Sequence, residues 1–519
     1  MKFPIKNTDT KSRTVNSLRN AATSLGGQIL NNLLRFVCRT AFMYTLGKNY
    51  LGISTLYANI LTLLSIAELG FGTAITYSLY KPLAEGDEAR IRSLMQYFRR
   101  AYRAIGLAIF GIGMCLVPFL PRLLSRIPTE INIYEYYLLY LIQTVVSYLF
   151  FAYKAVLLNA DQKKYITDLI QYVVQITMNV VQIAELILFR SFFAYTVLAI
   201  VFAVIQNVIT ACYVDRKYPY LREKADPLSR ADRRTIFTQV YATALYKVSS
   251  AIGTATDNLI ISTFIGTDMV GVYGNYYMII QVFQNIIDGL VRAFSASVGN
   301  LFAVESRQKS EFTFRCLNLL NNFAVAICAV GFLSVFQPFI TIWMGEDMLL
   351  ERTVLIIVVY NFAANYMQLV CNIYNEATGT FVHGKYRAVA TAALNLIISI
   401  ILVRKMGLAG VFVGTIVSRL MTTFWYDPVL LYRRAFQKPV AGYFVRYGVT
   451  ILLISVCAGA VYVLGKPLAA HPVAALLGKG VLAIAVTSAV FWLVYRRSEE
   501  YAFLRGKFKT VILRKVKKK

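Results

Sequence analysis

The feature that most constrains this chain is the recurrence of apolar segments of about 20 residues along its whole length. A helix of that length crosses the hydrocarbon core of a bilayer, which is about 30 Å thick. Only 15% of the residues are charged, whereas soluble domains usually carry about 25%. The sequence therefore predicts an all-α membrane protein with about 14 transmembrane helices.

The expected spans, bounded to within a few residues, are 24–46, 53–79, 102–121, 136–157, 166–189, 193–214, 237–264, 272–302, 316–341, 353–378, 388–406, 410–431, 443–465 and 473–495. The segment before the first span has no compact apolar core followed by a small-residue cleavage site. We therefore expect no removable signal peptide, and we expect the first span to be the first crossing.

The formal net charge is +28, and the distribution of the basic residues predicts the orientation. If both termini lie on one side, about 40 of the 54 Lys and Arg residues fall on that side. This positive-inside pattern predicts a multi-pass protein of the plasma membrane with both termini in the cytoplasm. The basic tail, residues 496–519, is expected to lie against anionic membrane lipids. No nucleic-acid-binding motif accompanies it, so we expect no nucleic-acid partner.

Enzyme motifs are missing from the sequence. There is no phosphate-binding G-x-x-x-x-G-K-[ST] loop, no G-x-S-x-G and no H-E-x-x-H. The longest external loop, 122–135, is too short for a catalytic domain. The seven cysteines lie in or beside the spans without paired spacing, and there are only two histidines, so we expect no disulfides, metal site or cofactor. These features favour a transporter over an enzyme.

An internal repeat at an offset of about 220 residues indicates how the spans are organised. The segment GKNYLGI from Gly47 resembles GTDMVGV from Gly266, and further matches pair Pro118 with Pro338, Lys164 with Lys385, and Pro219 with Pro439. Six helices repeated as six keep both copies in one orientation, related by an axis along the membrane normal. The expected divisions are 1–214 (N-terminal six-helix lobe), 215–235 (cytoplasmic linker), 236–432 (C-terminal six-helix lobe), 433–495 (two additional helices) and 496–519 (basic tail).

Polar residues within the spans recur every three or four positions and therefore share one helix face. In the first span this stripe comprises Gln28, Asn32, Arg35 and Arg39. The other stripes include Glu68 in the second span, Gln175 in the fifth, Lys247 and Asp257 in the seventh, Asp288 and Arg292 in the eighth, and Asn361, Asn365, Gln368, Asn372 and Asn375 in the tenth. A charge in the bilayer centre costs roughly 2.5–3.5 kcal/mol on insertion scales, so the stripes predict a hydrated cavity between the two lobes.

A structural alternative applies to each stripe. Arg35 and Arg39 can pair with Glu68, and Lys247 and Arg292 with Asp257 and Asp288, simply to hold helices together. The amide stripe of the tenth span can equally form interhelical hydrogen bonds. Both interpretations remain open from the sequence alone.

Residues 44–106 closely resemble the polysaccharide-export branch of bacterial oligosaccharide flippases, in the multidrug/oligosaccharidyl-lipid/polysaccharide exporter (MOP) superfamily. The resemblance is carried by Arg39-Thr40, Leu46-Gly47, Leu51-Gly52-Ile53, Glu68-Leu69-Gly70 and Tyr80-Lys81-Pro82-Leu83. It implies two six-helix lobes in a V-shaped, alternating-access arrangement, in a bacterial inner membrane. It also implies a flippase that moves polyprenyl-pyrophosphate-linked oligosaccharide to the outer leaflet for capsule, exopolysaccharide or O-antigen synthesis, with polysaccharide polymerase machinery as a possible partner.

Roles for individual residues are hypotheses within that resemblance. Arg35 and Arg39 are expected to bind the diphosphate, helped by Lys247, Arg292 or Arg419. Glu68, Asp257 and Asp288 are expected to form resting ion pairs or to bind a coupling cation, either Na⁺ or H⁺. The glycan is expected to contact Gln28, Asn32, Asn361, Asn365, Gln368 and Asn372.

Three other functions compete with this interpretation. A lipid II flippase and a multidrug/cation antiporter belong to the same superfamily, but the surplus of Arg and Lys in the spans argues against the antiporter. A membrane-embedded polysaccharide polymerase is disfavoured by the short external loops. At offset 219, Arg35 and Arg39 correspond to Thr254 and Asn258, so we expect anion binding to concentrate on the N-terminal lobe.

Overall fold

The computed structural model describes residues 27, 30–65, 71–124, 131–161, 163–230, 232–234, 236, 240, 256–292, 306–378, 385–470 and 472–506. Every regular element in these ranges is helical, which confirms the predicted all-α class. Within the same ranges, nine helices are long and apolar enough to cross a membrane, or ten if one bent pair counts as a single span. Several expected spans fall partly outside the described residues, so the total of fourteen remains a prediction.

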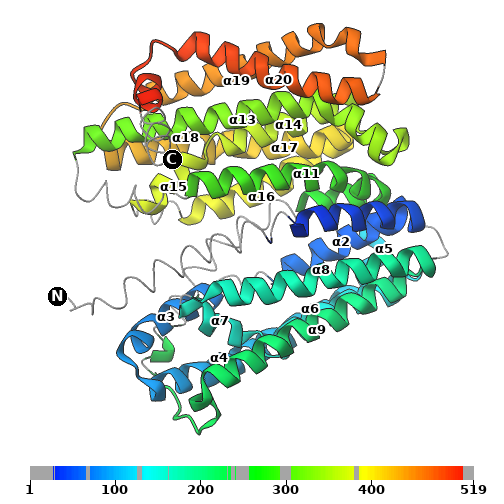
Figure 1. Cartoon of the computed structure of the whole chain (residues 1–519), viewed down its shortest axis with the longest axis vertical. Coiled ribbons are helices and arrows are strands. Elements are labelled where there is room, and N and C mark those ends of the chain that lie inside the picture. Colours follow the sequence, from blue (N-terminus) through cyan, green and yellow to red (C-terminus); the bar gives the residue numbers. More distant parts are fainter. Residues whose placement is uncertain are drawn as a thin grey trace, which may run out of the picture. The chain divides into compact units, whose positions relative to one another are not determined.

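The chain divides into two compact units, which we call unit 1 (Met1–Gly271) and unit 2 (Val272–Lys519). Unit 1 contains a helix over residues 30–46 and the elements α2 (Lys48–Leu64), α3 (Phe71–Glu85), α4 (Glu88–Leu116), α6 (Ile133–Leu149), α7 (Tyr153–Ala160), α8 (Lys164–Leu188) and α9 (Phe192–Lys217). Here α4 packs on α6, α6 on α9, and α8 on α9 (Figure 1).

Tyrosines form part of the core of unit 1 because their hydroxyls find backbone acceptors there. Tyr57 and Tyr137 are both fully buried; Tyr57 donates to the Ile133 carbonyl at 2.7 Å and Tyr137 to the Gly113 carbonyl at 2.9 Å. A buried hydroxyl left without a partner costs about 1–3 kcal/mol. These bonds therefore allow α2, α4 and α6 to pack through large aromatic residues.

The span expected at 136–157 is not one straight helix, and this corrects the sequence-based expectation. The chain bends by 50° between α6 and α7, at Phe151, whose φ is +59°. The bend lets Lys154 at the start of α7 meet Asp215 of α9, with Nζ and Oδ1 2.6 Å apart. Lys154 is buried, and a buried charge requires such a partner.

Unit 2 is built from one long helix surrounded by shorter ones. Its elements are α13 (Arg307–Met344), α14 (Arg352–Tyr366), α15 (Leu369–Ala377), α16 (Lys385–Met406), α17 (Leu408–Met421), α18 (Thr423–Leu431), α19 (Ala441–Leu464) and α20 (Pro472–Tyr495), while α11 (Thr267–Arg292) starts in unit 1 and continues into unit 2. In Figure 1, α13 lies beside α14 and α20, and these pairs are in contact.

Two expected spans of unit 2 are interrupted, one between α14 and α15 and one between α17 and α18. Interruptions leave backbone groups without helical partners, which is costly in a membrane. Side chains satisfy three of these groups: Asn321 donates to the Tyr366 carbonyl at 2.8 Å, Tyr447 to Ala364 at 3.2 Å and Gln368 to Phe424 at 2.9 Å. Gln368 thus connects one interruption to the other.

Matched positions of the repeat begin equivalent elements. Gly47 and Gly266 both have positive φ and directly precede α2 and α11. Lys164 and Lys385 are the first residues of α8 and α16. The boundary between the compact units, at Gly271, lies beyond the expected linker 215–235, and most of 237–255 falls outside the described residues, so the proposed lobe division stays a prediction.

Candidate substrate-binding residues

The helix over residues 30–46 carries the two predicted arginines of unit 1. Arg35 is exposed and Arg39 is half-buried. Arg39 donates through Nη2 to the Gly271 carbonyl, at 3.4 Å. For Arg35, the described residues include no carboxylate within 4 Å. The four-residue spacing puts both side chains on one face, and this face combines an exposed cation with an anchored one.

Amides beside this face come from the same helix and from α8. Asn31 is buried; it donates to Gln175 at 2.8 Å and accepts from Asn179 at 3.3 Å. The sequence-based prediction named Asn32, which is half-buried, and missed Asn31 and Asn179. The helical spacing could have found both, because Asn31 lies four residues before Arg35 and Asn179 four after Gln175.

The backbone that receives Arg39 belongs to a close contact between α2 and α11. A Cβ added to Gly52 would lie 2.0 Å from the Thr267 carbonyl oxygen, and one added to Gly271 would lie 3.1 Å from the Gly52 nitrogen. Only glycine permits this approach. Gly52 and Gly271 are equivalent positions of the repeat, so the contact is self-complementary, as in a symmetric interface.

The cation on α11 has different partners. Arg292 lies 3.6 Å from the Asp288 carboxylate, Nε to Oδ2, and 3.3 Å from the Glu376 carboxylate, Nη1 to Oε2. The contact with Asp288 matches the pairing alternative recognised in the sequence. Glu376 of α15 was missed, although it directly follows Asn375 in the amide stripe of the tenth expected span.

Arg419 joins the charges of unit 2 around a tyrosine. Tyr366 lies within electrostatic range of Asp288, Arg292 and Arg419, and Arg419 also interacts with Tyr447. Arg419 is half-buried. Asp288, Arg292 and Arg419 therefore lie around Tyr366, and Glu376 of α15 contacts Arg292.

The predicted glycan contacts fall into two groups. Asn361, Asn365 and Asn372 are half-buried. Gln368 is buried, and so is Asn375, which belongs to the same amide stripe but was not a predicted glycan contact. Their amides donate to the Phe424 and Asp427 carbonyls, at 2.9 and 3.3 Å. For these two residues the interhelical alternative describes the structure, because the side chains hold α15 to α18.

Gln28, Glu68 and Lys247 lie outside the described residues, so their predicted roles stay predictions. Asp257 and Asn258 are buried, at 6% and 4% exposed. Asn258 occupies the position equivalent to Arg39, and in the described part of the chain its buried Oδ1 has no hydrogen-bond partner. In the part of the chain that the structure describes, no three His, Cys, Asp or Glu residues are grouped to hold a metal ion.

No protein-family model matches the sequence, and no curated protein matches it. Solved structures do. A lipid II flippase, MurJ, in an inward closed conformation superimposes with a TM-score of 0.65 at 15% identity, covering 92% of this chain and 99% of its own. An inward-facing multidrug resistance transporter of the MATE family, MOP superfamily, gives 0.57 at 13%, covering 77% and 94%. A MOP-superfamily transporter from Pyrococcus furiosus gives 0.54 at 13%, covering 82% and 96%.

These likenesses establish the fold: the chain has the architecture of MOP-superfamily transporters, a multi-span membrane fold. The match to MurJ leaves uncovered a part of the chain shorter than the stretch from Ala441 to Tyr495. The matched part of the chain therefore includes residues of α19 or α20, the two additional helices expected from the sequence.

Proposed function

We propose that this protein is a flippase that moves a polyprenyl-diphosphate-linked oligosaccharide across the membrane by alternating access. The observation that carries the proposal is the arginine face of the helix over residues 30–46. A transporter-type fold supplies the scaffold, and this face supplies cations of the kind that a diphosphate requires.

The chemistry of the face suits a diphosphate. Guanidinium groups donate two parallel hydrogen bonds to phosphate oxygens and remain charged at physiological pH. Arg35 is exposed, and within the described residues no carboxylate lies within 4 Å of it, so its guanidinium can receive an incoming anion. The amides of Asn31, Gln175 and Asn179 lie along the same helix pair and can exchange their mutual bonds for glycan hydroxyls.

The ion pairs that Arg292 of α11 forms with Asp288 and Glu376 are proposed to exchange during transport. Arg292 is shared between Asp288 and Glu376, and its side chain is 49% exposed. Ion pairs this exposed are weak, at about 0.2–1 kcal/mol. They can therefore open and re-form during transport, or release a carboxylate to a coupling cation.

A lipid II flippase is the second candidate, favoured by the extent of the match. The MurJ structure covers 92% of this chain, whereas the MATE and other transporter structures cover 77–84% of it. A cation antiporter is less well supported, because the exposed charge of the arginine face repels cations. For the Pyrococcus furiosus protein, a reversed polarity of the binding pocket has been taken to suggest a different function.

The test is reconstitution of the purified protein in liposomes with a fluorescent polyprenyl-diphosphate oligosaccharide, whose exposure in the outer leaflet is measured by chemical quenching. The wild-type protein should flip this lipid, whereas Arg35→Gln/Arg39→Gln should lose at least about tenfold in rate, since charged hydrogen bonds contribute about 1.5–3 kcal/mol each. Arg122→Gln, an exposed arginine outside the face, is the matched control.

Parallel assays separate the candidates. Faster flipping of lipid II than of any glycan without a peptide would favour the second candidate. Transport of a cationic drug, with no flipping of either lipid, would refute both proposals.

A further inference from the structure

A polar pocket in unit 2 lies apart from the residues discussed so far. It opens between α13, α19 and the segment that follows α20, with a cavity volume of about 200 Å³. Its polar lining comprises Arg315, Asn318, Asn322, Arg446, Tyr495, Ser498 and Glu500. At roughly 30 Å³ per water molecule, the cavity has room for a small polar group.

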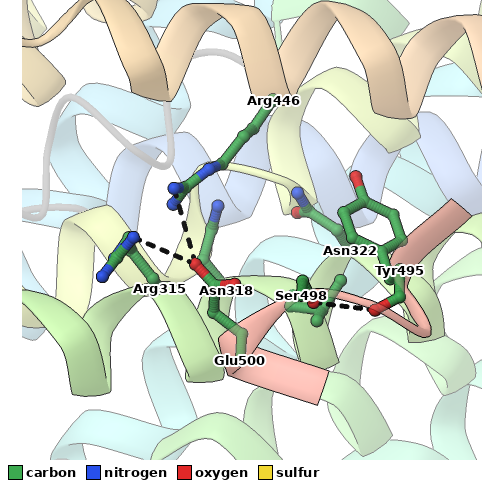
Figure 2. Close-up of a pocket in the computed structure, with 8 residues that line it drawn as sticks. Arg315, Asn318, Asn322, Arg446, Tyr495, Ser498 and Glu500 are labelled. Atoms are coloured by element: carbon green, nitrogen blue, oxygen red, sulfur yellow. Dashed lines mark hydrogen bonds and ion pairs between the residues drawn. The ribbon is translucent and has the colours of Figure 1, made fainter. Parts of the chain in front are cut away.

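Two arginines from different helices converge on one carboxylate in this pocket (Figure 2). Arg315 Nη1 lies 3.2 Å, and Arg446 Nη2 lies 3.4 Å, from the same oxygen of Glu500. The Glu500 side chain is only 12% exposed. Two positive charges thus face one negative charge, which leaves the lining with a surplus of one cation.

The surplus is not removed by the neighbouring acid. Glu311 contacts Arg315 at 3.2 Å, but it also contacts Lys438 at 2.9 Å. Glu311 and Lys438 therefore cancel each other. A ligand with a single negative charge would neutralise the pocket, which matters because uncompensated buried charge is costly.

Two buried amides add a second requirement. Asn318 and Asn322 are 6% and 4% exposed, and the Oδ1 atom of each has no hydrogen-bond partner among the described residues. Both belong to the same face of α13 as Arg315, at i+3 and i+7, and both line the cavity. Buried acceptors are nearly always bonded, so the pocket calls for a ligand that also carries hydroxyl donors.

The position of the pocket indicates where such a ligand would come from. It lies at the end of the candidate span Val473–Tyr495. Trp492 is exposed there, and the Arg496 guanidinium lies 5.1 Å from its ring centre. Exposed aromatic and basic residues gather at the headgroup level of membranes, so the pocket opens at the depth of lipid headgroups.

We propose that this pocket binds the headgroup of a hydroxylated anionic phospholipid, a glycerol phosphodiester of the phosphatidylglycerol type. Its phosphodiester carries one negative charge, to which Arg315 and Arg446 donate. Its headgroup hydroxyls donate to Asn318 and Asn322. Glu500 limits the pocket to a monoanion and holds the two arginines in place when the lipid is absent.

The test uses the full-length protein in detergent, titrated with phosphatidylglycerol and followed by native mass spectrometry of the lipid-bound species. Phosphatidylglycerol should be retained about tenfold more than phosphatidylcholine, and Arg446→Gln and Asn318→Leu should each lose most of that preference. Arg497→Gln is the matched control, because Arg497 is exposed at the same end of α20 and does not line the pocket; it should retain the lipid.

Glu500→Gln separates binding from folding. Removing the resident carboxylate raises the surplus charge, so lipid retention should increase, whereas a purely structural role predicts a loss like that of Arg446→Gln. The proposal is overturned if retention in Arg446→Gln and Asn318→Leu equals that of the wild type. It is also overturned if phosphatidic acid, which lacks headgroup hydroxyls, binds as well as phosphatidylglycerol, or if soluble glycerol phosphate displaces the lipid at equal concentration.

Discussion

Arg35 of unit 1 and Arg292 of unit 2 both occupy polar faces of otherwise apolar helices, yet their surroundings differ. Arg35 is exposed, and within the described residues no carboxylate lies within 4 Å of it. Arg292 contacts the carboxylates of Asp288 and Glu376, at 3.6 and 3.3 Å. In our proposal Arg35 binds an anion directly, whereas Arg292 must first exchange a partner.

The difference shows what the internal repeat preserved. Glycines and helix starts recur in both copies, because they set the backbone. The cations of the arginine face do not recur: the position equivalent to Arg39 is Asn258, which is buried. The two copies therefore share backbone features but differ in their charged side chains. In our proposal, the helix over residues 30–46 provides most of the anion binding.

The largest expected effect comes from reversing the charge at the anchored arginine. Arg39→Glu should abolish flipping of a diphosphate-linked lipid, because a carboxylate would repel the diphosphate at close range. The measurement is the reconstituted flipping assay, with membrane insertion checked by fluorescence size-exclusion chromatography. Normal export by Arg39→Glu would break the proposed division of roles between the units.

A second variant tests the backbone that receives Arg39. Gly52→Val should destabilise the protein by about 1–3 kcal/mol through overpacking, since a Cβ there would lie 2.0 Å from the Thr267 carbonyl oxygen. Thermal unfolding of the purified protein measures this. Gly111→Val is the control, because a Cβ on Gly111 meets nothing within 4 Å. Equal melting temperatures for the two variants would contradict the close approach.

A third experiment measures how firmly Arg292 is held. A double-mutant cycle of Arg292→Gln and Glu376→Gln should give a coupling of about 0.5 kcal/mol, kept small because the Arg292 side chain is 49% exposed. Arg35→Gln should change stability by less than about 0.5 kcal/mol. A coupling near zero would mean that Arg292 is as available as Arg35, and the contrast between the units would disappear.

The smallest expected effect is the pH dependence of stability that comes from the Arg90–Asp232 ion pair of unit 1. Arg90 and Ser229 hold the pKa of Asp232 below its ordinary value of 3.8, and the Arg90 Nη2 to Asp232 Oδ1 distance is 2.6 Å. Because the folded pKa is lowered, the pair stabilises the protein above pH 3.8 and this stabilisation is lost as the pH falls below it. Melting temperatures of wild type and Asp232→Asn should therefore converge on acidification; a constant difference would argue against the pairing.

Much of the fold could be predicted from the sequence, because apolar run length and helical periodicity are local properties. The all-α class, the expected span 443–465 as α19 and the span 473–495 as α20 follow from them closely. The bend at Phe151 and the interruption near Gln368 could not be predicted this way. Each is compensated by a distant residue, Asp215 in the first case and Phe424 in the second.

The site shows the same division. The spacing of Arg35 and Arg39 placed both on one face, and the pairing of Arg292 with Asp288 was recognised as an alternative. Glu376 lies 84 residues from Arg292, so no local pattern could connect them. Asn31 was accessible to the periodicity and was overlooked in favour of Asn32.

By itself, the sequence determined that this chain is a multi-span helical membrane protein with an internal repeat and cations on polar helix faces, because hydropathy and spacing act over one or two helical turns. Only the tertiary structure decided which cations meet carboxylates, which amides satisfy broken helices, and that Arg315 and Arg446 share Glu500. Those outcomes depend on pairing between helices far apart in the chain, where the cost of leaving a buried charge or polar group unpaired selects the partner.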